Sequence, residues 1–159
     1  MKVLGIDPGT GRMGWAIVEK KDGQEKLLEY GCLETPAHTP FPIRLEKIYL
    51  FLNKIIARHQ PDSASIEDLF FAKNRKTAIA VSGARGVIIL ACKQAKLDIH
   101  LYTPLQIKSS LTGYGQADKK QIQYMVKNIL KLEKTPQPDD SADAIASALT
   151  HLSHATIIS

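Results

Sequence analysis

The sequence has little cysteine, few aromatic residues and no long hydrophobic run. Its 159 residues include two cysteines, Cys32 and Cys92, and neither has the neighbouring cysteine or histidine expected at a zinc site. We therefore expect free, buried thiols. Asp7 interrupts the first apolar segment too early for a secretory signal, and no segment is long enough to cross a membrane. The sequence thus predicts a cytoplasmic protein with no membrane partner.

Acidic residues are scarce in the middle of the chain. Residues 73–131 contain 11 lysines and arginines but only two acids, Asp98 and Asp118, whereas the remainder has 10 basic and 14 acidic residues. This asymmetry is typical of proteins that bind a phosphate backbone, although a solvated basic helix face gives the same pattern. We favour nucleic acid as the partner.

The composition is that of an ordinary globular protein, with 44% hydrophobic and 23% charged residues. The length suits a single domain over residues 1–159. Apolar periodicity predicts an α/β protein that begins with three antiparallel strands. The strands are expected near residues 2–7, 13–20, 26–34, 61–67 and 98–102, and the helices near 40–59, 74–96, 103–113, from 118 and from 139.

Carboxylates occupy the ends of two apolar strands. Asp7 precedes the tight turn at Pro8, and Glu67 repeats the arrangement later in the chain. Each could simply cap a turn, but the recurrence favours a functional site on rigid backbone. Asp140 and Asp143 share one face at the start of the last helix, where Asp139 or Asp140 could also be the N-cap.

These four carboxylates form a set of oxygen ligands without histidine or cysteine. Such a set suits Mg²⁺ or Mn²⁺ better than zinc. Two such ions about 4 Å apart can activate a water and stabilise the leaving oxygen at phosphorus. Together with the basic middle of the chain, the acids predict a metal-dependent nuclease.

A cationic, aromatic segment follows Glu67. Aromatic rings stack on bases and cations bind phosphates, so this segment is a candidate nucleic-acid loop. We expect one of its two phenylalanines inside and one outside. The candidate DNA contacts are Phe70, Lys73, Asn74, Arg75 and Lys76 in this segment, and Lys108, Lys119 and Lys120 further on.

At these residues the sequence resembles the RuvC family of Holliday junction resolvases. The matching stretches, in chain order, are Gly5-Ile-Asp-Pro-Gly9, Ile66-Glu67 followed by Phe70 and Lys73-Asn74, Lys108 with Thr112-Gly-x-Gly115, and Asp140-x-x-Asp-Ala144. The resemblance implies a ribonuclease H-like fold: a five-stranded mixed sheet, the first three strands antiparallel, with helices on both sides. It also implies a crossover junction endodeoxyribonuclease of recombination and repair.

In the family, a homodimer binds a four-way DNA junction and makes symmetric paired nicks in strands of like polarity. Asp7, Glu67, Asp140 and Asp143 would then be the catalytic acids that bind two Mg²⁺ ions, with Mn²⁺ as a substitute. Phe70 would stack on an exposed base, while Lys108 and Lys119 contact phosphates. The resemblance further implies cooperation with the branch-migration proteins RuvA and RuvB.

The residues leave other functions open. The turn after Asp7 also resembles the phosphate loop of actin-like ATPases, which need two such domains. A related single-domain nuclease would act on structured RNA, and a non-catalytic protein would only bind junctions. For the dimer, the apolar helix around residues 82–86 is the candidate interface, with Gly83 and Gly86 spaced for close approach of another backbone.

Overall fold

The computed structural model describes residues 1–68 and 75–158, and side chains from 1–68 and 78–155. Five strands form one mixed sheet in the order β3-β2-β1-β4-β5. The strands are β1 (Lys2–Asp7), β2 (Arg12–Lys21), β3 (Gln24–Glu34), β4 (Ser63–Glu67) and β5 (Asp98–Tyr102). The helices are α1 (Phe41–His59), α2 (Arg75–Gln94), α3 (Pro104–Thr112), α4 (Lys119–Ile129) and α5 (Asp139–Ile158).

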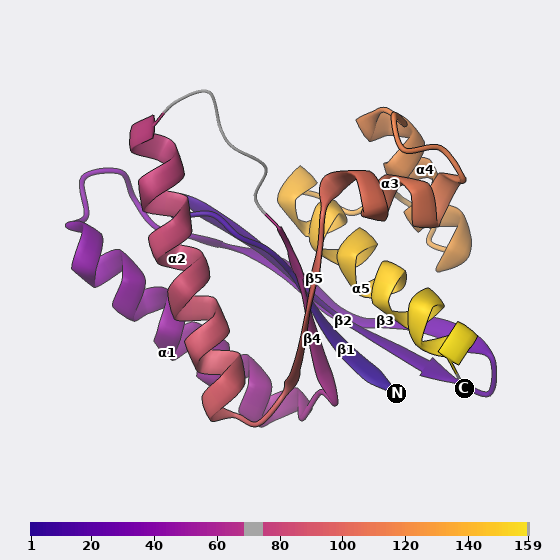
Figure 1. Cartoon of the computed structure of the whole chain (residues 1–159), viewed down its shortest axis with the longest axis horizontal. Helices are drawn as coiled ribbons and strands as arrows, with labels where there is room; N and C mark the ends of the chain where they lie inside the picture. The colour runs from indigo at the N-terminus through magenta and orange to yellow at the C-terminus, as the bar shows by residue number, and fades with distance from the viewer. Residues whose placement is uncertain (69–74, 159) are drawn as a thin grey trace.

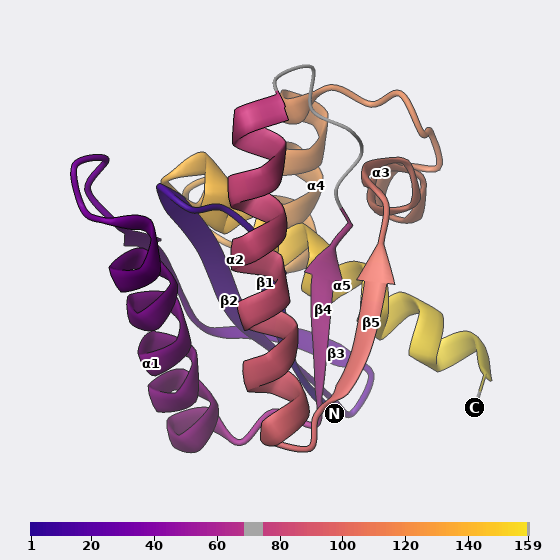
Figure 2. The same cartoon turned by 60° about the vertical axis from the view of Figure 1, so that its left-hand side comes forward.

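The sheet separates two layers of helices (Figure 1). Helices α1 and α2 lie side by side on one face, and α3, α4 and α5 cover the other, as Figure 2 also shows. Side chains that alternate along β1 enter two cores, because neighbouring residues of a strand point to opposite faces. Leu4 and Ile6 join the core under α1 and α2, whereas Val3 joins the core under α5.

Strand directions place the ends of β1 and β4 together. Strands β1, β2 and β3 are antiparallel neighbours, as predicted, and β4 joins β1 in parallel, with Ile6 opposite Ile66. Strand β5 continues the sheet in parallel beside β4. Parallel neighbours end at the same edge, so Asp7 and Glu67, the next residues in register, stand side by side there.

Capping boxes begin α3 and α4. The Thr103 hydroxyl accepts from the amide of Gln106, and the Asp118 carboxylate accepts from the amide of Gln121. Each glutamine side chain accepts in return from the cap residue's own amide, which satisfies donors that a helix end leaves unpaired. These boxes fix the ends of the two helices that flank the candidate site.

Helix α5 carries a buried histidine, and α2 corrects one expectation. His151 is buried, stacks on His100 with 4.0 Å between ring centroids, and shares a hydrogen bond with the Tyr102 hydroxyl. Gly83 does permit a close approach, but the neighbour is Phe41 of α1 in the same chain, 2.8 Å from where a Cβ would lie. Gly83 thus serves packing within one chain, whereas a Cβ at Gly86 would meet nothing within 4 Å.

The two thiols are free, as expected; Cys92 is buried and Cys32 is partly buried. In the described residues, no helix combines the length and apolar character that a membrane span requires.

Candidate active site

The four predicted acids come from three elements that meet at one edge of the sheet. Asp7 ends β1, Glu67 ends β4, and Asp140 and Asp143 lie in the first two turns of α5. Each of the four acts electrostatically on at least one of the others, and Asp7 is affected by all three of its neighbours. Residues separated by more than 130 positions in the sequence thus form one acidic cluster.

Glycines in the sheet allow α5 to come this close. A Cβ on Gly5 would lie 2.1 Å from the carbonyl oxygen of Ala144, and one on Gly14 would lie 1.9 Å from that of Asp140. No side chain larger than hydrogen fits at such distances, so the backbone of α5 rests directly on β1 and β2. This contact brings the start of α5 to the ends of the strands that carry Asp7 and Glu67.

Burial and mutual repulsion both disfavour the ionised form of the carboxylates in this cluster. Burial first, and then the charges of Glu67, Asp143 and Asp140, raise the pKa of Asp7 to about 8. Burial and the charge of Asp143 raise the pKa of Glu67 to about 7, against the effects of a hydrogen bond with Asp7 and the charge of Lys108. Burial also raises the pKa of Asp143. Such a site favours cations.

Two side-chain cations already pair with the outer acids. The Lys119 ammonium lies 3.2 Å from carboxylate oxygens of both Asp139 and Asp143. The Arg12 guanidinium lies 2.9 Å from an oxygen of Asp140. These pairs offset part of the repulsion, while Asp7 and Glu67 share a hydrogen bond behind them.

The neighbouring residues Asp139 and Asp140 at the start of α5 have different interaction partners. Asp139 pairs with Lys119 and accepts a hydrogen bond from Gln123, both on α4. Asp140 instead adds to the repulsion that raises the pKa of Asp7. The geometry therefore separates the doublet, with Asp140 facing the cluster and Asp139 facing α4.

The donor set fits a hard divalent cation. Its ligands are all carboxylate oxygens, and mutual repulsion makes a bound cation favourable. Among the side chains described, no three acidic, histidine or cysteine residues are already gathered at ligand distance of a single point. Asp143 and Asp140 pair with Lys119 and Arg12 instead. A metal ion would replace these cations as the partner.

A hollow of about 250 Å³ opens beside the acids. Glu67 and Asp143 line it on one side, and Lys108 and Lys119 supply its cations. Lys108 lies on α3, and its charge lowers the pKa of Glu67. A lining that contains both acids and cations can hold a phosphate group next to a metal site.

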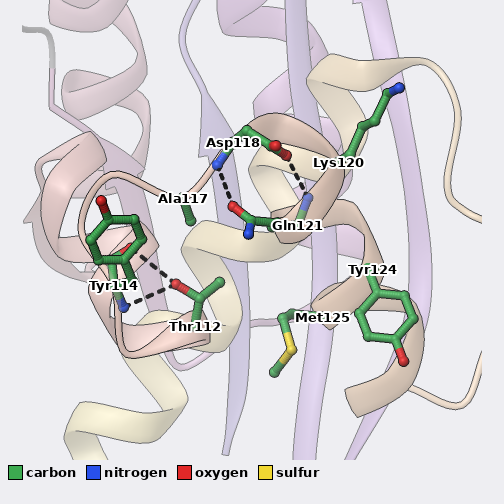
Figure 3. Close-up of a pocket in the computed structure, with 8 residues that line it drawn as sticks. All are labelled: Thr112, Tyr114, Ala117, Asp118, Lys120, Gln121, Tyr124 and Met125. Carbon is green, nitrogen blue, oxygen red and sulfur yellow. Dashed lines mark hydrogen bonds between the residues drawn. The ribbon is translucent and has the colours of Figure 1, made fainter.

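The other predicted DNA contacts are Lys120 and five residues whose side chains lie outside the described part of the chain. Lys120, on the exposed side of α4, lines a separate hollow (Figure 3). Phe70, Lys73 and Asn74 lie outside the described residues. Arg75 and Lys76 begin α2, with side chains outside the described part.

Sequence reasoning missed two arginines. Arg12, which pairs with Asp140, opens β2 just after the glycine-rich turn, and no neighbouring residue in the sequence indicates this partner on α5. Arg85 on α2 forms an ion pair at 2.7 Å with Asp68, the residue after Glu67. The Asp68 amide also donates a hydrogen bond to the Tyr102 carbonyl. This pair fixes the chain just beyond Glu67. Nothing local in the sequence indicates it.

Comparison with known proteins decides the family. A family model described as crossover junction endodeoxyribonuclease RuvC matches residues 3–151. The chain belongs to the RuvC family. Crossover junction endodeoxyribonucleases RuvC from Caldicellulosiruptor saccharolyticus and Finegoldia magna are 54% and 53% identical to it, over 96% of this chain and 92% and 93% of theirs.

Solved structures confirm the predicted ribonuclease H-like class of fold. Thermus thermophilus RuvC in complex with Holliday junction substrate is similar with a TM-score of 0.94 and 33% identity, covering 99% of this chain and 96% of that one. The yeast mitochondrial Holliday junction resolvase Ydc2 has a TM-score of 0.68 at 15% identity, over 96% of this chain and 78% of that one. At that identity the likeness concerns the fold alone.

Proposed function

We propose that this chain acts as a single-domain Holliday junction resolvase, an endonuclease that hydrolyses phosphodiester bonds in four-way DNA junctions. The observation that carries the proposal is the meeting of Asp7, Glu67, Asp140 and Asp143 beside a hollow with two lysines, in a member of the RuvC family. The junction is the substrate because the similar Thermus protein binds one.

The acids are assigned the metal-binding role. Asp7 and Glu67 supply rigid oxygens from strand ends, and Asp140 and Asp143 supply the helix side. Mg²⁺ held by these residues would lower the pKa of a bound water and offset charge on the leaving oxygen. Four carboxylates can supply ligands for two ions in each site. Mn²⁺ prefers the same ligands and should substitute for Mg²⁺.

The lysines are assigned the substrate phosphate. Lys119 pairs with Asp139 and Asp143 while no other cation neutralises them, and its long side chain can turn to a phosphate once they bind metal. Lys108 stands on the other side of the same hollow. The two cations would orient the scissile phosphate toward the acids, which is where positioning contributes most to the rate.

Paired nicks are best explained by a dimer, because a two-fold symmetric protein presents two equivalent sites to a two-fold symmetric junction. The outward face of α2 is our candidate interface, since Ile79 and Leu90 are exposed there on either side of Gly86. Cooperation with RuvA and RuvB, and a cytoplasmic location, stay predictions.

The test is cleavage of a labelled four-way junction in Mg²⁺, with binding measured separately in EDTA. Asp7→Asn and Asp140→Asn should each bind the junction but lose more than about a hundredfold in cleavage rate, since a metal ligand is removed. Asp139→Asn is the matched control, because this neighbouring carboxylate faces α4 and should keep the rate within about threefold.

Three outcomes would contradict the proposal or its details. Junction binding by the wild type with no cleavage across Mg²⁺ and Mn²⁺ would indicate a non-catalytic junction-binding protein. No preference for a junction over a duplex, with cleavage of structured RNA, would indicate the RNA nuclease. Equal losses in Asp139→Asn and Asp140→Asn would refute the division between these aspartates.

A further inference from the structure

A second, larger hollow lies apart from the acids, between the end of α3 and the outer side of α4. Its volume is about 540 Å³, within the range of sites that hold small organic groups. Figure 3 shows Tyr114 and Tyr124 at its two sides, with Ala117 and Met125 between them. Its lining includes Thr112, Tyr114, Ala117, Lys120, Tyr124 and Met125.

The two tyrosine rings are unusually open to solvent for such large apolar groups. Tyr114 is 59% exposed and Tyr124 is 64% exposed. The backbone beneath them is well fixed: the Tyr114 amide donates to the Thr112 hydroxyl, and the capping box of α4 closes the next turn. Exposed rings on a rigid support, around an apolar floor, form a surface on which a flat aromatic ligand can stack.

The charges around the hollow favour an anionic ligand. Lys120, Tyr124 and Lys127 lie four and three residues apart on α4, so one side of the helix alternates cation, ring and cation. This pattern is typical of surfaces that bind single-stranded nucleic acid, where cations hold phosphates and rings stack on bases. Asp118, the acid at the rim, is engaged as the cap of α4 by the Gln121 amide.

The hollow lies next to the candidate active site, and helices α3 and α4 contribute residues to both. Lys119 reaches the acids, and Lys120, the next residue, lines the hollow. On α3, Lys108 lines the site and Thr112 lines the hollow one turn later, about 6 Å along the helix axis. A DNA strand whose phosphate lies between Lys108 and Lys119 can therefore extend onto the tyrosines within a few nucleotides.

We propose that this hollow binds one unstacked base of the DNA strand that leaves the candidate active site, with the base against Tyr124 and Tyr114 and a flanking phosphate on Lys120. The identity of the strand as DNA rests on the proposed function. The hollow would be a second stacking position, on elements different from the segment that contains Phe70.

The test compares Tyr124→Ala, Tyr114→Ala and Tyr124→Phe with Tyr30→Ala, a control at another exposed tyrosine, on β3. Two probes are used in EDTA: a four-way junction with 2-aminopurine at single positions on either side of the cut, and a fluorescein-labelled oligothymidine of 12 nucleotides. Loss of one stacking ring should weaken oligothymidine binding roughly 5- to 150-fold. Tyr124→Phe and Tyr30→Ala should stay within about twofold of wild type, because the first keeps the ring and the second lies elsewhere.

On the junction, one or two 2-aminopurine positions should be quenched by the wild type and become bright with Tyr124→Ala. Lys120→Ala should lower the salt dependence of binding by about one phosphate contact without restoring that fluorescence.

Failure of this site is distinguishable from failure of the proposed function. If the junction is bound and cut but no position responds to either alanine variant, and oligothymidine binding is unchanged, the stacking site is refuted and the resolvase stands. If the junction is not bound at all, the oligothymidine comparison alone decides: a loss confined to the two alanine variants supports a base-stacking site, and equal binding by every variant overturns it.

Discussion

Asp7→Asn should make the metal-free protein more stable while it abolishes cleavage. The substitution keeps the size of the side chain and leaves an amide that can donate a hydrogen bond to Glu67. It removes a carboxyl group whose ionised form burial and three neighbouring acids oppose. The same charge would be needed to bind the metal, so a gain in stability and a loss of activity have one cause.

The magnitude follows from the pKa of about 8 that Asp7 has in the fold, against 3.8 for a free aspartate. Relative to a low pH at which Asp7 is protonated in both the folded and the unfolded state, this difference in pKa lowers the stability at pH 7 by about 4 kcal/mol. Because Glu67 shares part of this effect and Asp7 is not fully shielded from water, we expect about half of it, or about 2 kcal/mol. For a chain of this length that is about 4–8 °C in Tm.

The pH dependence has a definite sign. Between pH 4 and pH 8 the folded state holds a proton on Asp7 that the unfolded chain has lost, so stability falls as the pH rises through this window. The assay is thermal and urea unfolding in EDTA at pH 6.5, 7.5 and 8.5, where His151 is neutral. The wild type should lose stability across the series, and the variant should lose less.

Addition of Mg²⁺ should reverse the order. A cation that binds the folded state stabilises it in proportion to its affinity, so the wild type should gain more than Asp7→Asn. Asp139→Asn controls for a general loss of negative charge, since Asp139 is paired with α4. The reasoning would be refuted if Asp7→Asn were less stable than the wild type in EDTA at pH 8.5. It would also be refuted if Asp139→Asn raised the stability in EDTA as much as Asp7→Asn does.

Three further predictions concern the surroundings of the acids. Gly14→Ala places a Cβ 1.9 Å from the Asp140 carbonyl, so unfolding in denaturant should show a loss of about 1–3 kcal/mol and cleavage should fall. Gly86→Ala, inside α2 and with nothing within 4 Å of the added Cβ, should instead stabilise the monomer by about 0.5–1 kcal/mol, because alanine has the higher helix propensity. Lys119→Met leaves Asp143 without its cation, so EDTA unfolding should show a less stable protein and junction cleavage should slow. Burial, His100 and His154 lower the pKa of His151 to about 4, so protonation of the unfolded chain should remove about 2 kcal/mol of stability as the pH falls from 6.5 to 4. In a pH series of urea unfolding, His151→Phe should lose less stability over this range. An unchanged dependence of stability on pH would contradict the prediction.

The parts of the fold that sequence reasoning predicted are those with local causes. The β1–β2 hairpin follows from an apolar run, a turn and a second apolar run, and the starts of α3 and α4 follow from four-residue capping boxes. The strand ends at Asp7 and Glu67 were likewise readable, because an acid directly after a buried run marks a strand end. Each of these features is complete within a few residues of sequence.

The parts that sequence reasoning missed depend on contacts between distant elements. Arg12 reaches an acid on α5, Gly83 adjoins Phe41, and His151 lies between β5 and its own helix. A lone glycine, arginine or histidine carries no local signal of its partner. The pairing of β4 beside β1 was available only through the resemblance to a known family, since periodicity gives strands but not their order.

The acids themselves show why the site needs the whole fold. A cluster that raises the pKa of Asp7 to about 8 works against folding, so the rest of the chain must hold it together. The hold comes from the two glycines that admit the backbone of α5 and from the two cations, Lys119 and Arg12, that pair with its acids. The glycine contacts are rigid and the ion pairs are exchangeable. Backbone packing therefore keeps the acids in place, while the cations can give way to a metal ion and a phosphate.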